Sequence, residues 1–317
     1  MQSIEDRYAI GAKAMVLLLA VNIPLGALKL AFGVTSMSAA LVSSSIMTTM
    51  TALTTVSTLT SMRLATRRAD KQLFFVQSKL GVMFSRLVAT LLVIFGIIIA
   101  RGNAVNLLTG DYARPKWPAL VLALASVLIK EACYITTRRA AAKTHNSAIM
   151  TEAVYQRIDM GGSLVAFFGA LIGMMWVPAL DPVAGIIIGA GLSWMGLQLW
   201  WNSIAELLEE KLEPQLMGSI SKVLDSVRTR QGKFTLMEAT ARKYGGFVYV
   251  DVKVGMDPSI TLLESHAASE RIESLIKRAL PFVSGVDVDA EPSAEDVANY
   301  SDNAEEQPKK PKAEDQG

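Results

Sequence analysis

Six long apolar runs in the first two thirds of the chain constrain its fold more than any other feature. They cover roughly residues 10–32, 35–62, 78–101, 117–138, 147–176 and 181–206. Each reaches the ~20 residues with which a helix crosses about 30 Å of hydrocarbon, where backbone polar groups must bond within the segment. We therefore expect an α-helical membrane bundle of six transmembrane helices. The first run is too long and too polar for a cleaved signal peptide, so we interpret it as a span.

The distribution of charge predicts the orientation. Basic residues follow the second and fourth runs, namely Arg63, Arg67, Arg68, Lys71, Arg138, Arg139 and Lys143. The turns after the first and fifth runs carry no Lys or Arg, although the segment from Arg101 to Lys116 holds some opposing charge. The positive-inside rule then places both termini in the cytoplasm. The formal net charge of only +2 argues against nucleic acid as a partner and leaves the lipid bilayer as the expected one.

Beyond Pro214 the pattern becomes that of a small soluble domain. Apolar residues recur at helical spacing over 216–227, and alternating valines predict a strand over 248–254 after a strand near 234–243 and a turn at Gly245-Gly246. Thr261 and Glu264 form a capping-box signature for a second helix, and a short strand follows at 286–290. The order predicts a C-terminal α+β (ferredoxin-like, α-β-β-α-β) cytosolic domain. We expect domains at 1–208 and 209–292 and a disordered acidic tail at 293–317.

Ionisable side chains inside membrane spans are costly and need a reason to be there. The candidates are Lys29, Arg86, Lys130, Glu131, Arg157 and Asp159. Because long basic side chains snorkel to the interface, we interpret Lys29, Arg86 and Arg157 in this way. Asp159 begins a long apolar stretch and needs a partner inside the bundle. It is either a functional carboxylate or a structural one paired with Arg157 or Lys130.

The second run is unusual because Ser, Thr, Ala and Met dominate it from Ser36 to Ser61. Small residues allow close helix packing, and their hydroxyls bond within and between helices. Alternatively, Ser43 and Met47, one turn apart, line a cation pathway, although hydroxyl and thioether are weak metal ligands. The single cysteine, Cys133, allows no intramolecular disulfide and is expected to be a small packing residue.

Several stretches resemble the cation diffusion facilitator family over most of residues 10–292. They are Asn22, Lys29, Gly33, Ser36, Ser38 to Val42, Lys130, Tyr134, Asn146, Asp159, Asp181-Pro182, Leu207 to Glu209, Gly246 to Val254, Asp257-Pro258, Thr261 to His266 and Val286 to Pro292. The resemblance implies a dimer that exchanges Fe²⁺, Zn²⁺, Mn²⁺ or a similar cation for protons. It implies neither an enzyme nor a cofactor, and the sequence shows no arrangement of nucleophile and base.

The resemblance also assigns positions to a transport site. Family members hold the ion with four Asp or His side chains, and the matching positions here are Ser43, Met47, Tyr155 and Asp159. Three of these four are not the expected ligands, and the set is poor for tetrahedral Zn²⁺. The loop positions that often carry histidines for a second metal match Leu73 and Gln77.

The resemblance extends to the predicted cytosolic domain. Glu238, His266 and Asp289 match a metal site there and are expected to form a weak site at a dimer interface, or else are a helix-start histidine and two surface carboxylates. Lys79 and Glu209 match a pair that joins two protomers near the membrane surface.

Two functions follow from this resemblance. The first is proton-coupled transport of a divalent cation by Asp159 with a reduced ligand set. The second is a transport-deficient relative that forms a homodimer, or a heterodimer with an active paralogue that it supports. The cell inner membrane or a magnetosome membrane is the expected location, because some family members work in magnetosomes.

Overall fold

The computed structural model describes residues 4–66, 71–207, 218, 222, 234–244, 247–256, 261–280 and 283–292. The chain forms two compact units, one within residues 1–210 and 243–247 and the other within residues 211–242 and 248–317. The first unit is helical and the second contains the strands. The predicted tail at 293–317 and the turn at Gly245-Gly246 lie outside the described residues.

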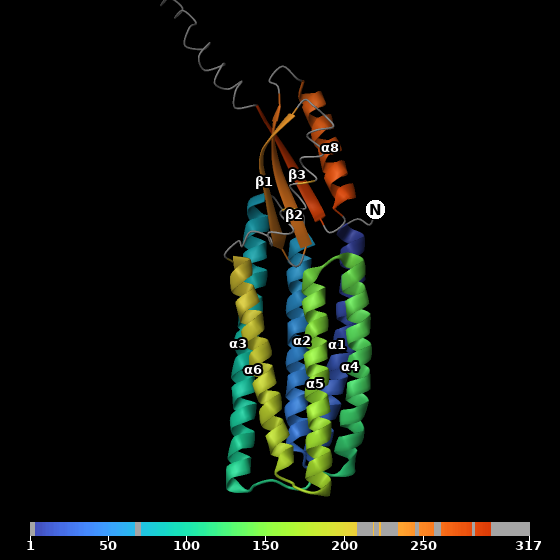
Figure 1. Cartoon of the computed structure of the whole chain (residues 1–317), viewed down its shortest axis with the longest axis vertical. Helices are drawn as coiled ribbons and strands as arrows, with labels where there is room; N and C mark the ends of the chain where they lie inside the picture. Colours follow the sequence, from blue (N-terminus) through green and yellow to red (C-terminus); the bar gives the residue numbers. More distant parts are fainter. Residues whose placement is uncertain are drawn as a thin grey trace, which may run out of the picture. The chain divides into compact units, whose positions relative to one another are not determined.

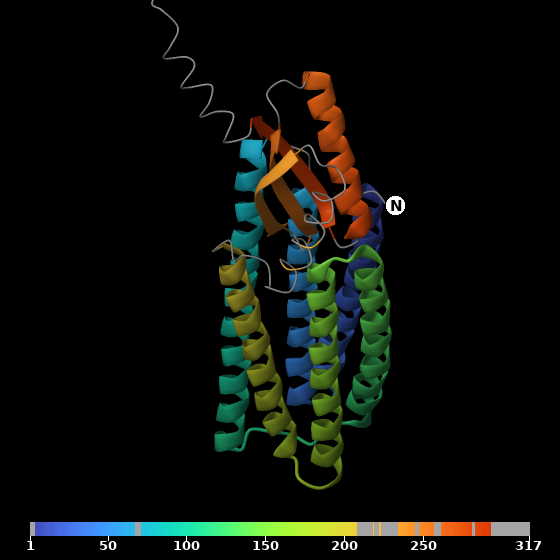
Figure 2. The same cartoon turned by 45° about the horizontal axis from the view of Figure 1, so that its top comes forward.

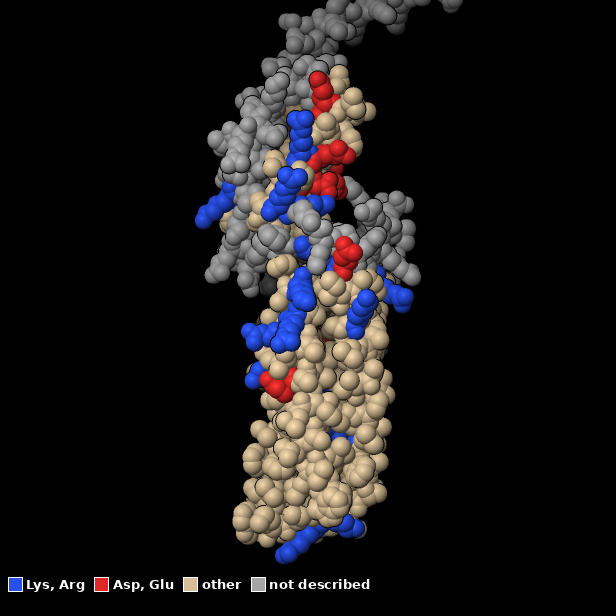
Figure 3. Space-filling model, turned by 90° about the vertical axis from the view of Figure 1, so that its right-hand side faces the viewer, with Lys and Arg blue, Asp and Glu red and all other residues tan. Residues whose placement is uncertain are grey.

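Six long helices form the first unit (Figure 1). They are α1 (Ile4–Thr35), α2 (Ala39–Thr66), α3 (Lys71–Thr109), α4 (Trp117–Thr144), α5 (Ser147–Met175) and α6 (Leu180–Leu207). All six are long and apolar enough to cross a membrane, so the predicted six-span bundle is confirmed. On the face seen in Figure 3, the middle of the bundle is nearly free of charged side chains, as expected of a surface in contact with lipid.

The third helix ends later than the sequence predicted. It continues past Arg101 to Thr109, because apolar residues go on to Leu108 and Arg101 is accommodated on the exposed surface. Gly110 follows with φ of 73°, the left-handed conformation that commonly ends a helix. The predicted charged loop is therefore shortened to the residues between α3 and α4.

The helices form two groups. Helices α1, α2, α4 and α5 pack against one another, and α3 packs along α6, as Figures 1 and 2 both show. Glycine brings α3 and α6 close together: a Cβ on Gly189 would lie only 2.7 Å from the amide nitrogen of Ala100 and from the carbonyl oxygen of Gly96. Small residues at a helix contact are typical of bundles in lipid.

Among its described residues, the second unit contains a three-stranded sheet and one long helix. Strands β1 (Phe234–Tyr244), β2 (Phe247–Met256) and β3 (Val283–Pro292) lie in the order β1-β2-β3, and β2 pairs parallel to β3. Helix α8 (Leu262–Ala279) connects these two parallel strands and begins with the predicted capping box of Thr261 and Glu264.

The core of this unit matches the predicted pattern. The alternating Val250, Val252 and Val254 pack with Ile272 and Ile276 of α8. The β-β-α-β part of the predicted fold is thus confirmed. The predicted first helix lies outside the described residues except for Gly218 and Lys222, which are helical.

Candidate transport site in the helical bundle

An ion pair between Lys130 of α4 and Asp159 of α5 lies at the centre of the buried polar side chains. Both side chains are fully buried, and the Lys130 ammonium contacts Asp159 Oδ2 directly. Lys130 Nζ also donates to Asn22 Oδ1 at 2.8 Å and to Gln156 Oε1 at 3.2 Å. Thr48 Oγ1 donates to the second carboxylate oxygen, Asp159 Oδ1, at 3.0 Å. Of the partners considered for Asp159, the structure therefore shows Lys130.

Lys29 of α1 does not snorkel, so this part of the sequence interpretation is wrong. Its side chain is fully buried, and its ammonium donates to Ser163 at 2.8 Å, Thr48 at 3.0 Å and Ser44 at 3.1 Å. Three hydroxyls satisfy its three N–H groups, which removes the reason to reach the interface. By contrast, half of the Arg157 side chain is exposed, 3.9 Å from Glu131.

Glu152 of α5 is a further buried carboxyl that the sequence analysis missed. Thr55 donates to Glu152 Oε1 at 2.5 Å and Thr54 at 3.3 Å, and Thr58 donates to Oε2 at 3.3 Å. Gln156 Nε2 lies 3.4 Å from Oε1 and joins Glu152 to the Lys130 cluster.

The spacing of polar residues contains the missing signal. On α5, Glu152, Gln156, Asp159 and Ser163 follow one another at steps of three or four, and Ser44, Thr48, Thr51, Thr55 and Thr58 do the same on α2. Each stripe lies on one face of its helix, and the two faces meet where α2 packs on α5. Read together, they predict a buried polar network between these helices.

The network is balanced in formal charge. Lys29 and Lys130 supply two cations, and Asp159 and Glu152 supply up to two negative charges. Buried charges need partners: Lys130 and Asp159 pair with each other, and Lys29 and Glu152 are held by hydrogen bonds. The arrangement holds four helices together and leaves both Asp159 oxygens already engaged by donors.

The four predicted transport-site positions have different surroundings, and their role as a site stays a prediction. Ser43 Oγ donates to the carbonyl oxygen of Ala39 at 2.7 Å, and Met47 and Tyr155 are buried in one apolar cluster. The Tyr155 phenol oxygen has no hydrogen-bond partner within the described part of the chain. Among the described residues there is no group of three or more His, Cys, Asp or Glu side chains placed to hold a metal ion.

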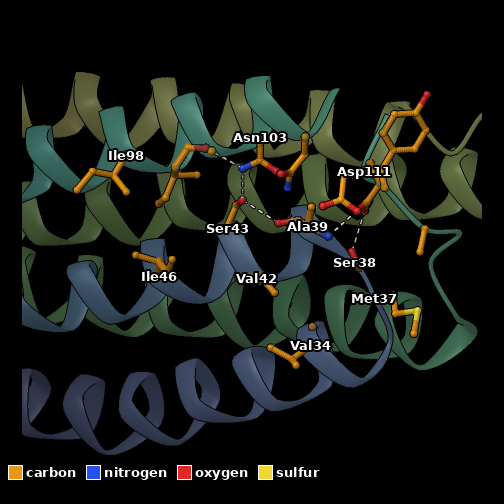
Figure 4. Close-up of a pocket in the computed structure, with 17 residues that line it drawn as sticks. Val34, Met37, Ser38, Ala39, Val42, Ser43, Ile46, Ile98, Asn103 and Asp111 are labelled. Atoms are coloured by element: carbon orange, nitrogen blue, oxygen red, sulfur yellow. Dashed lines mark hydrogen bonds between the residues drawn. The ribbon is translucent and has the colours of Figure 1, made fainter. Parts of the chain in front are cut away.

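A pocket of about 440 Å³ reaches Ser43 from the end of the bundle that carries the α1–α2 and α3–α4 connections. Its lining comes from α1, α2, α3, the loop after α3 and Asp181 of α6. Figure 4 shows Asn103 turned toward Ser43, to which its Nδ2 donates at 3.0 Å. Asp181 accepts hydrogen bonds from Ser38 Oγ and from the amides of Ala39 and Ala40, and so caps α2.

The residues predicted to form a C-terminal metal site lie on β1, β3 and α8. Glu238 on β1 pairs with Lys253 at 3.2 Å, and this hydrogen bond raises the pKa of the exposed Lys253. Asp289 on β3 lies in register with Lys253, whereas His266 on α8 is exposed, 3.5 Å from Glu270. Within one chain the three side chains are not brought together, and a site shared between two chains stays a prediction.

Some predicted positions cannot be placed. Glu209 lies outside the described residues, and the side chains of Lys79, Leu73 and Gln77 are also outside them, although these three positions belong to α3. The dimer contact therefore stays a prediction.

The fold and the buried polar centre define a multi-pass helical membrane protein of the transporter class. Residues 15–208 match the Cation efflux transmembrane domain, and residues 217–293 match the Cation efflux protein, cytoplasmic domain. The chain belongs to the cation diffusion facilitator family, whose activity is the transport of divalent metal cations rather than catalysis. The predicted family is thereby confirmed.

Three relatives illustrate the spread of this family. The chain is 24% identical to the Manganese efflux system protein MneP of Bacillus subtilis, over 92% of the chain and 99% of that protein. It is 23% identical to the Magnetosome protein MamB of Paramagnetospirillum magneticum, over 70% of the chain and 74% of that protein. It is 30% identical to Metal tolerance protein C1 of Arabidopsis thaliana, over 55% of the chain, and the match spans only 36% of that protein.

Proposed function

We propose that this chain is a cation diffusion facilitator subunit whose central site is closed to divalent cations. The observation that carries the proposal is the pairing of Lys130 with Asp159, the one carboxylate among the four transport-site positions. An ammonium takes the place that a cation would occupy. The chain then acts as a partner of a second family member, identical or different.

Elementary electrostatics supports this closure. A divalent ion near Asp159 would meet the ammonium groups of Lys130 and Lys29, which lie on either side of its hydrogen-bonded carboxylate. Repulsion between unscreened charges is strong in a medium of low dielectric constant. Zn²⁺ also needs about four good donors, and Ser43, Met47 and Tyr155 supply no imidazole, carboxylate or thiolate.

A role as a partner is supported by the C-terminal domain. Residues 217–293 match the family's cytoplasmic domain, whose fold is used for dimerisation. We propose a homodimer or heterodimer with both termini in the cytoplasm, in the cell inner membrane or in a magnetosome membrane. The similarity to the Magnetosome protein MamB favours the second location.

The test is uptake of Zn²⁺, Fe²⁺ and Mn²⁺ into liposomes that contain the purified protein, under a pH gradient, beside Asp159→Ala. We expect liposomes with either protein to take up no more metal than empty liposomes do. Wild type should at the same time elute from a size-exclusion column as a folded dimer. Uptake by wild type that Asp159→Ala abolishes would contradict the proposal.

The second candidate is proton-coupled transport of a cation of the Fe²⁺, Zn²⁺ or Mn²⁺ class through Asp159. Two observations favour it: the pocket that reaches Ser43, and the Tyr155 phenol oxygen, which no described residue hydrogen-bonds. In this alternative, Lys130 leaves Asp159 when the ion binds, and Ser43, Met47 and Tyr155 complete the ligand set. The same uptake assay distinguishes the two candidates.

A further inference from the structure

Glu152 is a fully buried carboxyl group that the proposed function does not use. Its partners are the hydroxyls of Thr54, Thr55 and Thr58 on α2 and the amide of Gln156 on its own helix. Among the described residues no cationic side chain forms an ion pair with it. We propose that Glu152 is a proton-binding site inside the bundle, which takes up one proton from water and releases it again.

The hydroxyl groups around Glu152 can hydrogen-bond to it both when it is ionised and when it is protonated. When Glu152 is ionised, Thr55, Thr58 and Gln156 donate to it, and Thr54 donates to the carbonyl oxygen of Thr51 at 2.8 Å. When it is protonated, its O–H bond donates to Thr55 Oγ1, and the Thr55 hydroxyl turns to the same carbonyl oxygen at 3.0 Å. A hydroxyl both donates and accepts, so proton binding requires only rotation of hydroxyl hydrogens.

The short contact and the neutral partners of Glu152 suit a proton. Thr55 Oγ1 lies 2.5 Å from Glu152 Oε1, which is the spacing of a short O–H···O hydrogen bond. Among the described residues, Glu152 belongs to no group of three or more His, Cys, Asp or Glu side chains that could hold a metal ion, whereas a proton needs only this hydrogen bond.

The titratable groups nearest to Glu152 come from three helices. Tyr155 lies on the same helix. Lys130 of α4 is linked to Glu152 through Gln156. Asp159 of α5, which pairs with Lys130, and Lys29 of α1 lie further along the network. On α2 the facing groups are the threonines. The formal charges of Lys29, Lys130, Asp159 and Glu152 sum to zero when Glu152 is ionised. Proton binding to Glu152 therefore leaves the network with one net positive charge. The proton thus changes the field at the Lys130–Asp159 pair.

The direct test is infrared spectroscopy of the full-length protein in liposomes over a pH series, which detects the C=O band of a protonated carboxyl. We expect wild type to show a buried carboxyl band that rises as the pH falls. Glu152→Gln should lose this band, while the control Glu131→Gln, which removes a carboxylate whose side chain is 37% exposed, should keep it. A band that survives in Glu152→Gln, or that does not change with pH in wild type, would overturn the proposal.

A second variant keeps the inference testable if Glu152→Gln does not fold. In Thr55→Val the new side chain has nearly the same shape as threonine, but it lacks the hydroxyl that hydrogen-bonds to Glu152 in its ionised and protonated forms. The midpoint of the Glu152 band should then shift along the pH axis, while Thr60→Val, which removes an exposed α2 hydroxyl bonded to its own helix, leaves it in place. Equal midpoints in Thr55→Val and wild type would contradict the role of the hydroxyl cage.

Discussion

The two helix groups of the membrane domain are held together by different physics. Helices α3 and α6 meet through glycine and apolar side chains, with the backbones of Gly96 and Gly189 in close approach. Helices α1, α2, α4 and α5 meet around Lys29, Lys130, Asp159 and their polar partners. The α3–α6 contact depends on close packing, and the contact among the other four helices depends on an ion pair and hydrogen bonds between buried side chains.

This difference separates packing from chemistry within the bundle. Apolar packing between α3 and α6 carries no chemistry and needs only small residues. The polar group includes Asp159, one of the four positions predicted for a transport site, and the Lys130 ammonium contacts its carboxylate. We propose that both contacts stabilise the fold and that the second is a structural network rather than an ion site.

The largest effect is expected for Lys130→Met, which leaves Asp159 buried without its cation. Breaking a buried ion pair from one side costs about 3–5 kcal/mol. The free energy of unfolding, measured by denaturant titration in mild detergent, should fall by that amount. The double variant Lys130→Met with Asp159→Leu should recover most of the loss, because it buries neither charge. A single variant as stable as wild type would show that the pair does not organise the bundle.

Lys29→Met should have a smaller effect, since hydroxyl groups rather than a carboxylate receive its ammonium. Ser163 already donates to the carbonyl oxygen of Asp159 at 3.0 Å, so the hydroxyls keep partners. We expect a loss of about 1–3 kcal/mol, the cost of hydrogen bonds to a charged group. The same titration checks this, and a loss larger than that of Lys130→Met would reverse the order of importance of the two lysines.

The α3–α6 contact is tested by Gly189→Ala beside Gly191→Ala on the same helix. The new methyl at position 189 would lie 2.7 Å from backbone atoms of α3, whereas position 191 has no neighbouring atom within 4 Å. Overpacking of this kind costs about 1–3 kcal/mol, and we expect Gly191→Ala to be neutral or slightly stabilising. Equal melting temperatures for the two variants would mean that the helices are not held in close contact.

Much of the fold was predictable because its signals are local. Apolar length defined the six spans, the valines of β2 defined a strand, and Thr261 with Glu264 defined the start of α8. The end of α3 was missed because a lone Arg101 looked like the start of a loop. An exposed arginine is tolerated within a helix, and Gly110 was the better signal.

The site was less predictable because partners distant in sequence define it. Asp159 was recognised as needing a partner, and Lys130 was one of those considered. Lys29 was assigned to the interface, since a single helix does not reveal that hydroxyls of α2 and α5 face it. Glu152 was overlooked for the same reason: its threonine cage belongs to another helix.

The most direct test of the central claim is the number of Zn²⁺ ions bound per chain, measured by equilibrium dialysis of the purified full-length protein beside Asp159→Asn. Any binding to the C-terminal domain is common to both proteins and cancels in the comparison. If Lys130 fills the central site, wild type and Asp159→Asn bind the same number of ions. One additional ion in wild type that is lost in Asp159→Asn would show that Asp159 is a metal ligand and that the site is open.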